Sequence, residues 1–280
     1  MRVVLPSYLS ARTIYSVVGQ VLSDRLEIRS DRFSFDFSAL VAVEPAGIAA
    51  LAGLIDRLRL EGALCALLAG TSSPQEPATQ TLHRAGFFPQ VLHHPIPFSP
   101  SSPTCWMPLL PIPLNRWRER IEQAVLPWLA GELEQSRFVA VWKLSALSDI
   151  VPAWDDAAPA IASARIDSDR GRVALSFAGA LCPAVFAPEA ASGTFERLLA
   201  GLPHEVEGWA ALHTGWTSFT AIPQGHRRAA HAYPAPVPYP GWLLDLVFSV
   251  DSLSLHPLLN EPRAMPAGRP ALASTSSSPA

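Results

Sequence analysis

The sequence predicts a mixed α/β protein built from two units. Residues 33–58 read as an alternating strand, a short turn and an amphipathic helix, which is how a small α/β unit begins. Residues 89–114 then carry eight prolines, too many for a helix or an interior strand. After them the chain starts with a helical pattern and continues with strand-like runs, as in an α/β sandwich. A length of 280 residues is sufficient for two such units.

The first unit is expected to span residues 1–90. Alternating phenylalanines over Phe33–Phe37 predict its clearest strand. Apolar residues at helical spacing predict a helix over Ala46–Leu60 that ends near Gly62. The other elements predicted for this unit are strands at Leu26–Ile28 and Ala63–Ala69 (the second one buried), a helix at 77–84 and a closing segment at Gly86-Phe87-Phe88.

Residues 91–114 are predicted to be a proline-rich linker. Proline lacks a backbone N–H and fixes φ, so this stretch is expected to be partly extended. Its apolar side chains would pack it across the surface of a domain, through Trp106, Met107, Leu109 and Leu110.

The second unit is expected to span residues 115–252. Asn115 is a suitable helix N-cap, and the helix after it should be kinked at Pro127. A further helix is predicted near 138–150, and the Gly/Pro-rich stretch 225–241 is predicted to be a mobile, mildly basic loop. The predicted strands are Ile161–Asp167, Arg172–Phe177, Trp209–His213, Thr217–Ala221 and Trp242–Val250. Residues 253–280 form a tail, with disorder expected from about 261.

Composition excludes several classes of function. The net charge is −3 and only 16% of residues are charged, so nucleic acid is not expected as a partner. Three cysteines lie far apart without a CxxC pair, which predicts a reducing compartment and no metal site. No apolar run reaches the roughly 18 residues of a membrane span, and no signal peptide is recognised. We therefore expect a cytoplasmic protein.

The turn Glu44-Pro45-Ala46-Gly47, between a strand and a helix, carries a family resemblance. Together with Gly62 and the later LHRAGFF, it resembles STAS domains of the anti-sigma-factor-antagonist type over about residues 3–90. The resemblance implies binding to a protein partner without turnover. Pro45 stands where phosphoregulated members have a serine, so that switch is expected to be absent.

The same resemblance implies a partner-binding surface. It would include Glu44, Pro45, Ala46, Gly47 and Arg57. A purely structural interpretation of the turn is also open. Proline suits the first turn of a helix, glycine permits close packing, and a carboxylate is favourable near a helix N-terminus.

The second unit carries a fainter resemblance. A helical segment at 141–160, a strand–turn–strand pattern at 162–186 and a Pro-Gly followed by an apolar run at 239–250 resemble a GHKL (histidine-kinase-like) ATPase domain. The positions that hold the catalytic Glu, the metal-binding Asn and the adenine-binding Asp in that family align with Ser148, Pro152 and Phe177. Of the family's glycines after that Asp, Gly179 is retained. The resemblance therefore implies a pseudo-ATPase without a cofactor.

A register shift leaves an alternative open for the second unit. Asp149, Asp155 or Asp156 would then hold Mg²⁺, and Gly179 would face the phosphates. The chain would be a divergent ATP-binding protein, such as an anti-sigma-type serine kinase or a histidine-kinase-like ATPase, with Mg-ATP as its cofactor. The simpler interpretation of these aspartates is a solvated helix end.

The leading hypothesis is a non-catalytic bacterial regulatory protein. It would act by protein–protein binding through its STAS-like unit, with a degenerate GHKL-like unit beside it. The divergent ATP-binding protein is the first alternative. A scaffold that uses the proline-rich linker as a docking ligand is the second.

Overall fold

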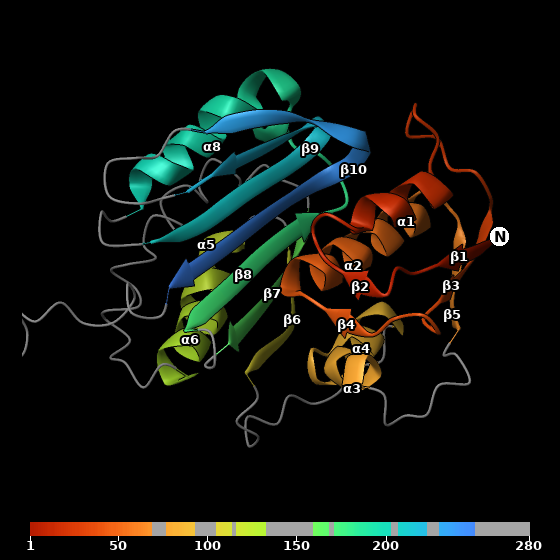
Figure 1. Cartoon of the computed structure of the whole chain (residues 1–280), viewed down its shortest axis with the longest axis horizontal. Helices are drawn as coiled ribbons and strands as arrows, with labels where there is room; N and C mark the ends of the chain where they lie inside the picture. Colours follow the sequence, from red (N-terminus) through yellow and green to blue (C-terminus); the bar gives the residue numbers. More distant parts are fainter. Residues whose placement is uncertain are drawn as a thin grey trace, which may run out of the picture.

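The computed structural model describes residues 1–68, 77–92, 105–113, 116–132, 159–167, 171–202, 207–222 and 230–249. The fold is mixed α/β, as the sequence predicts. Figure 1 shows two separate sheets with the helices α1 (Ile14–Val21) and α2 (Pro45–Leu60) lying between them. Further helices cover the far face of the larger sheet. The predicted helix at 138–150, Asp149, Asp156 and the tail lie outside the described residues.

The smaller sheet is parallel and belongs to the first unit. Its strand order is β1 (Arg2–Val4), β3 (Arg32–Asp36) and β5 (Leu64–Leu68). A separate parallel pair, β2 (Tyr8–Leu9) and β4 (Ala42–Val43), leads into α2. Phe33 and Phe35 point into the core, as their alternation predicts.

One strand prediction in this unit is wrong, and a second is right about the strand but wrong about its burial. No strand forms over Leu26–Ile28, because Leu26 adopts a left-handed backbone with φ of 62° and only a single bridge joins Leu22 to Ile28. The strand predicted at Ala63–Ala69 forms, but it is not buried. It is β5, at the edge of the sheet, and its Leu64 and Leu68 side chains are 64% and 42% exposed.

Helix α2 is buried on both sides. Twelve of its 16 residues are buried, far more than one amphipathic face supplies. One side covers the small sheet, and the other contacts β7, β8 and β10 of the larger sheet. The small side chains of α2 allow this close packing: a methyl group at Gly53 would lie 3.5 Å from the Cβ of Ala178. Helix α2 therefore joins the two units by packing against both sheets.

The first unit ends in two short helices, α3 (Pro77–Arg84) and α4 (Phe87–Leu92). The predicted helix at 77–84 is confirmed. Gly86 turns the chain between the two helices with a positive φ of 66°. Phe87 and Phe88 then pack edge-on and tilted against Phe37, with ring centroids 5.9 Å away in both pairs. The closing aromatic segment thus anchors α4 to the end of β3.

The larger sheet has five antiparallel strands in the order β6-β7-β8-β10-β9. Its first strand, β6 (Trp106–Ile112), lies inside the range predicted as a linker. Two prolines are tolerated there because β6 is an edge strand and needs hydrogen bonds on one side only. The backbone N–H of Leu109 also donates to the Ala85 carbonyl at 2.7 Å, so β6 is bonded to the first unit as well.

The helix predicted after Asn115 contains an irregular turn next to Pro127. It consists of α5 (Trp117–Arg120), a π-helical turn η1 (Ile121–Val125) and α6 (Leu126–Glu132). Proline has no N–H, and its ring clashes with the carbonyl four residues earlier. The wider π turn just before Pro127 accommodates both effects, and this is a known cause of helix bending.

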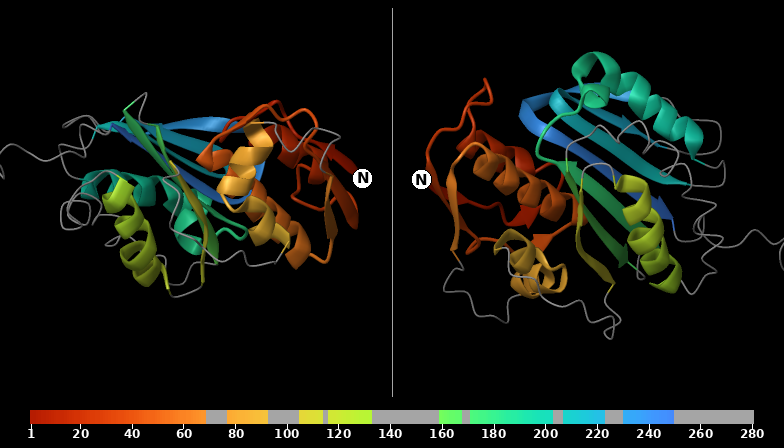
Figure 2. Two further views of the ribbon diagram at one scale, coloured as in Figure 1. Left: turned by 90° about the horizontal axis from the view of Figure 1, so that it is seen from below. Right: turned by 180° about the vertical axis from the view of Figure 1, so that it is seen from behind.

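The remaining strands of the larger sheet are β7 (Ala160–Asp167), β8 (Arg172–Gly179), β9 (Gly208–Ala221) and β10 (His231–Ser249). A short 3-10 turn η4 (Ala184–Phe186) and α8 (Pro188–Gly201) connect β8 to β9. The two strands predicted at Trp209–His213 and Thr217–Ala221 are one strand, which continues through Gly215 with a positive φ of 50°. Figure 2 shows α5, α6 and α8 on the face of this sheet that lies away from α1 and α2.

Strand β10 starts eleven residues before the predicted Trp242. Residues 231–241 were predicted as part of a mobile loop, and the structure corrects this. We call residues 231–241 of β10 its arm. Strand β8 pairs only with Trp242–Ser249, so the arm pairs with a strand on one side only, β9. Prolines are tolerated there because the other side needs no N–H donors. His226, Arg227 and Arg228 of the same predicted loop lie outside the described residues.

Replacement of Gly47 by alanine is expected to destabilise the protein by roughly 1–3 kcal/mol. The new methyl group would lie 2.4 Å from the carbonyl oxygen of Leu9, and that backbone atom is fixed by the β2–β4 pair. The matched control is Gly193→Ala in α8, where a methyl group meets nothing within 4 Å. Alanine is the better helix former, so the control should gain about 0.5–1 kcal/mol. Urea denaturation of both variants measures the difference. Equal midpoints would contradict the close packing of α2 on β2.

Candidate functional site

The predicted partner-binding turn is mostly buried. Pro45, Ala46 and Gly47 are enclosed by the fold, and Glu44 is half-buried. The Glu44 carboxylate accepts a hydrogen bond from the hydroxyl of Tyr8. Of these four residues, Glu44 alone therefore offers accessible side-chain area to another molecule, and the partner-binding role of the turn stays a prediction.

Arg57 is not brought next to that turn. It lies 13 residues along α2 from Glu44, a separation of about 20 Å at the rise of an α-helix. Its guanidinium pairs with the carboxylate of Glu61 one helical turn away. The structure thus gives Arg57 a local partner on its own helix, and its predicted role in partner binding also stays a prediction.

Gly179, predicted as a nucleotide-binding glycine, has a packing role. A methyl group there would lie 2.1 Å from the indole nitrogen of Trp242. That indole stacks on Phe186 at 4.8 Å and lies 5.7 Å from Trp117, and Trp117 lies 5.5 Å from Phe177, measured between ring centroids. The face of the sheet that lies away from α2 is therefore filled, around Phe177 and Gly179, by four aromatic rings.

Three polar side chains lie in a row on the opposite face of the sheet, beneath α2. They are Asp245, Ser176 and Ser163, which are direct neighbours across β10, β8 and β7. Asp245 is only 6% exposed, and the Ser176 hydroxyl donates to its carboxylate at 2.7 Å. Burial raises the pKa of Asp245 to about 7, and the nearby Glu44 carboxylate also raises this pKa. Among the described residues, the Ser163 hydroxyl has no hydrogen-bond partner.

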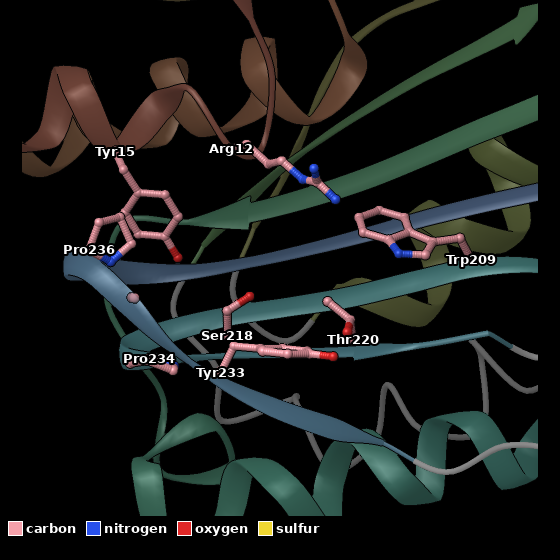
Figure 3. Close-up of a pocket in the computed structure, with 9 residues that line it drawn as sticks. Arg12, Tyr15, Trp209, Ser218, Thr220, Tyr233, Pro234 and Pro236 are labelled. Atoms are coloured by element: carbon pink, nitrogen blue, oxygen red, sulfur yellow. The ribbon is translucent and has the colours of Figure 1, made fainter.

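A pocket of 410 Å³ lies between the start of α1 and the β9–β10 hairpin. Figure 3 shows Arg12 and Tyr15 projecting from the first unit toward side chains of the second. Strand β9 contributes Trp209, Ser218 and Thr220, and strand β10 contributes Tyr233, Pro234, Ala235 and Pro236. Residues of both units therefore form this pocket, and several of them are exposed to solvent.

A buried histidine lies behind the pocket wall. His213 is 5% exposed, and its Nδ1 lies 2.9 Å from the Tyr15 hydroxyl and 3.0 Å from the Ser218 hydroxyl. Desolvation lowers the pKa of His213 to about 4, with a further contribution from the Arg12 charge. Burial raises the pKa of Tyr15, so its hydroxyl keeps its proton. The ring of His213 is therefore neutral near pH 7.

No local pattern in the sequence indicates this pocket. Arg12 lies just before α1, and His213 was assigned only to a strand. Tyr233 and its neighbouring prolines were placed in a loop. The contact between Tyr15 and His213 joins residues 198 positions apart, a separation that no local pattern encodes. The one visible hint was the unusual density of prolines and aromatics between residues 233 and 242.

The described residues contain no group of three or more His, Cys, Asp or Glu side chains placed to hold a metal ion. None of the described helices is both long enough and apolar enough to cross a membrane. Comparison with protein-family models, with curated proteins and with solved structures found no match to this chain. The resemblances to STAS and GHKL domains accordingly remain expectations from the sequence.

Asp245 and His213 are expected to affect the pH dependence of stability in opposite directions. Between its ordinary pKa of 3.8 and its folded pKa of about 7, Asp245 binds more protons in the folded state, so stability falls as pH rises. Between about 4 and 6.5, His213 binds fewer protons in the folded state, so stability rises with pH. From about pH 4 to 6.5 the two slopes should largely cancel.

Replacing either Asp245 or His213 should leave the pH dependence of stability that the other residue causes. Relative to the parent protein, Asp245→Asn should make stability rise by about 1.4 kcal/mol per pH unit between about pH 4 and 6.5. His213→Gln should make it fall by a similar amount. Urea denaturation at several pH values measures both slopes. Parallel curves for the parent protein and both variants would contradict the assignment of these two groups.

Proposed function

We propose that this protein is a non-catalytic regulatory protein that acts by binding a protein partner. In this proposal the first unit is a STAS-type module and the second is a degenerate GHKL-type unit. The observation that carries the proposal is the outer face of the small parallel sheet. Parallel sheets are normally covered on both faces. Here α1 and α2 cover one face, and no described helix covers the other (Figure 1).

That outer face presents apolar side chains to solvent. Leu64 and Leu68 of β5 are exposed, as is Val4 of β1, and β3 lies between the two strands. Val4, Asp36 and Leu68 are direct neighbours across the sheet. The Asp36 carboxylate between Val4 and Leu68 forms an ion pair with Arg2, so the face combines exposed apolar side chains with a charged pair, a mixture common in protein–protein contacts. The edge of β5 also offers backbone groups that an added strand can pair with.

The turn at Glu44 remains part of the proposed function as a second contact. Only Glu44 is accessible there, because Pro45–Gly47 are buried within the fold. A partner that uses this turn would therefore meet the Glu44 carboxylate and the partly exposed Tyr8 beside it. Arg57 would belong to a different contact area.

Packing around Gly179 supports the absence of nucleotide turnover. A GHKL-type site needs backbone atoms near this glycine to be open to the nucleotide. Here the Trp242 indole lies over Gly179, and in the proposed GHKL alignment Phe177 stands at the position of the carboxylate that binds the adenine amino group. A missing hydrogen-bonding partner costs roughly 1–3 kcal/mol of binding free energy, so the loss of several partners weakens nucleotide binding strongly.

Titration of Mg-ATP into the purified chain is expected to give no heat and no shift of the melting temperature. A ligand at 100 times its Kd would add about 2.7 kcal/mol of stability, which a melt detects easily. A Kd below about 100 μM, roughly 5.5 kcal/mol of binding free energy, would contradict the proposal. In that case Asp149→Asn and Asp156→Asn would test the alternative of a divergent ATP-binding protein.

A photoreactive benzoylphenylalanine at Leu64 or Leu68 is expected to crosslink one discrete protein in cells that naturally make this chain. Both positions are exposed on the proposed contact face, so the substitution should be tolerated. The matched control is the same residue at Glu196, exposed on α8. The proposal fails if all three positions give the same products, or if none gives a product.

A further inference from the structure

We infer that the pocket between α1 and the β9–β10 hairpin is a binding site for a small carboxylate carried on a flat apolar body. This inference goes beyond the proposed function and does not depend on it, because the pocket lies apart from the outer face of the small sheet. Its volume of 410 Å³ falls within the range of roughly 300–1,000 Å³ typical of small-molecule sites. A site of this size accommodates one or two fused rings.

The walls of the pocket suit a flat body. Trp209 and Tyr233 contribute aromatic surface from neighbouring strands, and Tyr15 contributes a third ring from α1. Pro234 and Pro236 add rigid apolar surface. Figure 3 shows the Tyr233 ring below Ser218 and Thr220, with Trp209 at the side and Arg12 above them. Such walls bind planar rings by stacking and by burial of apolar area.

Arg12 supplies the charge that selects an anion. Its side chain is exposed, and none of the ion pairs in the described part of the chain involves it. No acidic residue lines the pocket either. A guanidinium group presents its N–H donors in a fork that matches the two oxygens of a carboxylate. The stem of Arg12 therefore places a planar cation, without an ion pair among the described residues, at the mouth of an aromatic pocket.

Two hydroxyl groups add donors to the pocket, one from Tyr15, which projects from the same unit as Arg12, and one from Ser218 on β9. The oxygens of Tyr15 and Ser218 both lie within hydrogen-bond distance of His213 Nδ1. A neutral imidazole nitrogen carries either one proton or one lone pair. When Nδ1 carries the proton, its single N–H is shared between these two oxygens or donated to one of them, and neither hydroxyl has to give its proton to the ring, so both hydroxyl protons can turn toward the pocket. Together with Arg12, they would surround one anionic group with donors.

The surroundings of His213 leave its tautomer to be set by the ligand. Within the described part of the chain, Nε2 has no hydrogen-bond partner, so no second contact fixes the proton on either nitrogen. Without a ligand, Nδ1 can accept from a hydroxyl. A bound carboxylate needs both hydroxyl protons and favours the tautomer with the proton on Nδ1. His213 is thus a positioning residue that acts through Tyr15 and Ser218.

Isothermal titration with indole-3-carboxylate tests the site, with indole-3-carboxamide as its neutral counterpart. We expect a Kd on the order of 100 μM for the carboxylate, in line with the efficiency of small ligands. The carboxamide should bind at least about tenfold more weakly, because it lacks the charge that pairs with Arg12. Inorganic phosphate, which lacks the flat body, should also bind at least about tenfold more weakly.

Matched variants locate the binding. Arg12→Leu should weaken indole-3-carboxylate at least about tenfold, and Ser218→Ala by about threefold. Arg25→Leu makes the same change of charge at an exposed arginine that does not line the pocket, and it should leave the Kd within about twofold. Because Arg12 and Arg25 are both exposed, thermal melts should show that both variants fold as the parent does.

Nitrogen-15 NMR of labelled histidine gives a readout that a purely structural role would not change. We expect the carboxylate to place the His213 proton on Nδ1, with His213→Gln used to assign the signal. Three results would overturn the inference: equal binding of the acid and the amide, equal binding of phosphate, or equal losses from Arg12→Leu and Arg25→Leu. A bound complex with the proton on Nε2 would overturn the role given to the two hydroxyls.

Discussion

The burial of α2 on both of its sides is the constraint on which the rest of the structure depends. A helix enclosed between two sheets can carry only small or apolar side chains at most positions, which explains the alanines and glycines of Pro45–Leu60. Helix α2 approaches β8 closely because Gly53 and Ala178 have small side chains. The first turn of α2 approaches β2 closely because Gly47, next to the Leu9 carbonyl, has no side chain. The buried apolar residues of α2 lie in one core cluster, which also includes Ile161, Ala178 and Leu243 of the larger sheet, so loosening this helix would affect both units together.

The same packing brings polar groups into a buried layer. Asp245, Ser176 and Ser163 lie beneath α2, while His213 and Ser218 form a second group with Tyr15 of α1. Buried polar groups cost stability unless they are fully hydrogen-bonded, and Ser163 Oγ and His213 Nε2 are without partners among the described residues. A fold selected for stability alone would replace these atoms with apolar groups. Their presence at the junction of the two units suggests that the junction serves binding.

Local patterns predicted the elements that local physics determines. The alternation at Phe33–Phe37 and the spacing in Ala46–Leu60 gave β3 and α2 almost to the residue. Predictions failed where the structure of a segment is determined by its pairing with strands that are distant in the sequence. Leu64–Leu68 is at an edge because, among the described residues, β3 is its only partner strand, and β10 tolerates prolines because β8 ends opposite Trp242. The pocket was not predicted, since it needs Arg12 and Trp209 to meet across two units.

The prolines of β10 have a consequence for how the molecule behaves in a crowded solution. Four of the seven residues from Pro234 to Pro240 are proline, so this arm can offer few N–H groups to a strand from another molecule. It therefore resists the edge-to-edge growth by which exposed strands form fibrils. Strand β5 has no proline among Leu64–Leu68. The colloidal stability of the protein should therefore depend on whether the β5 edge is occupied, and less on the long hairpin.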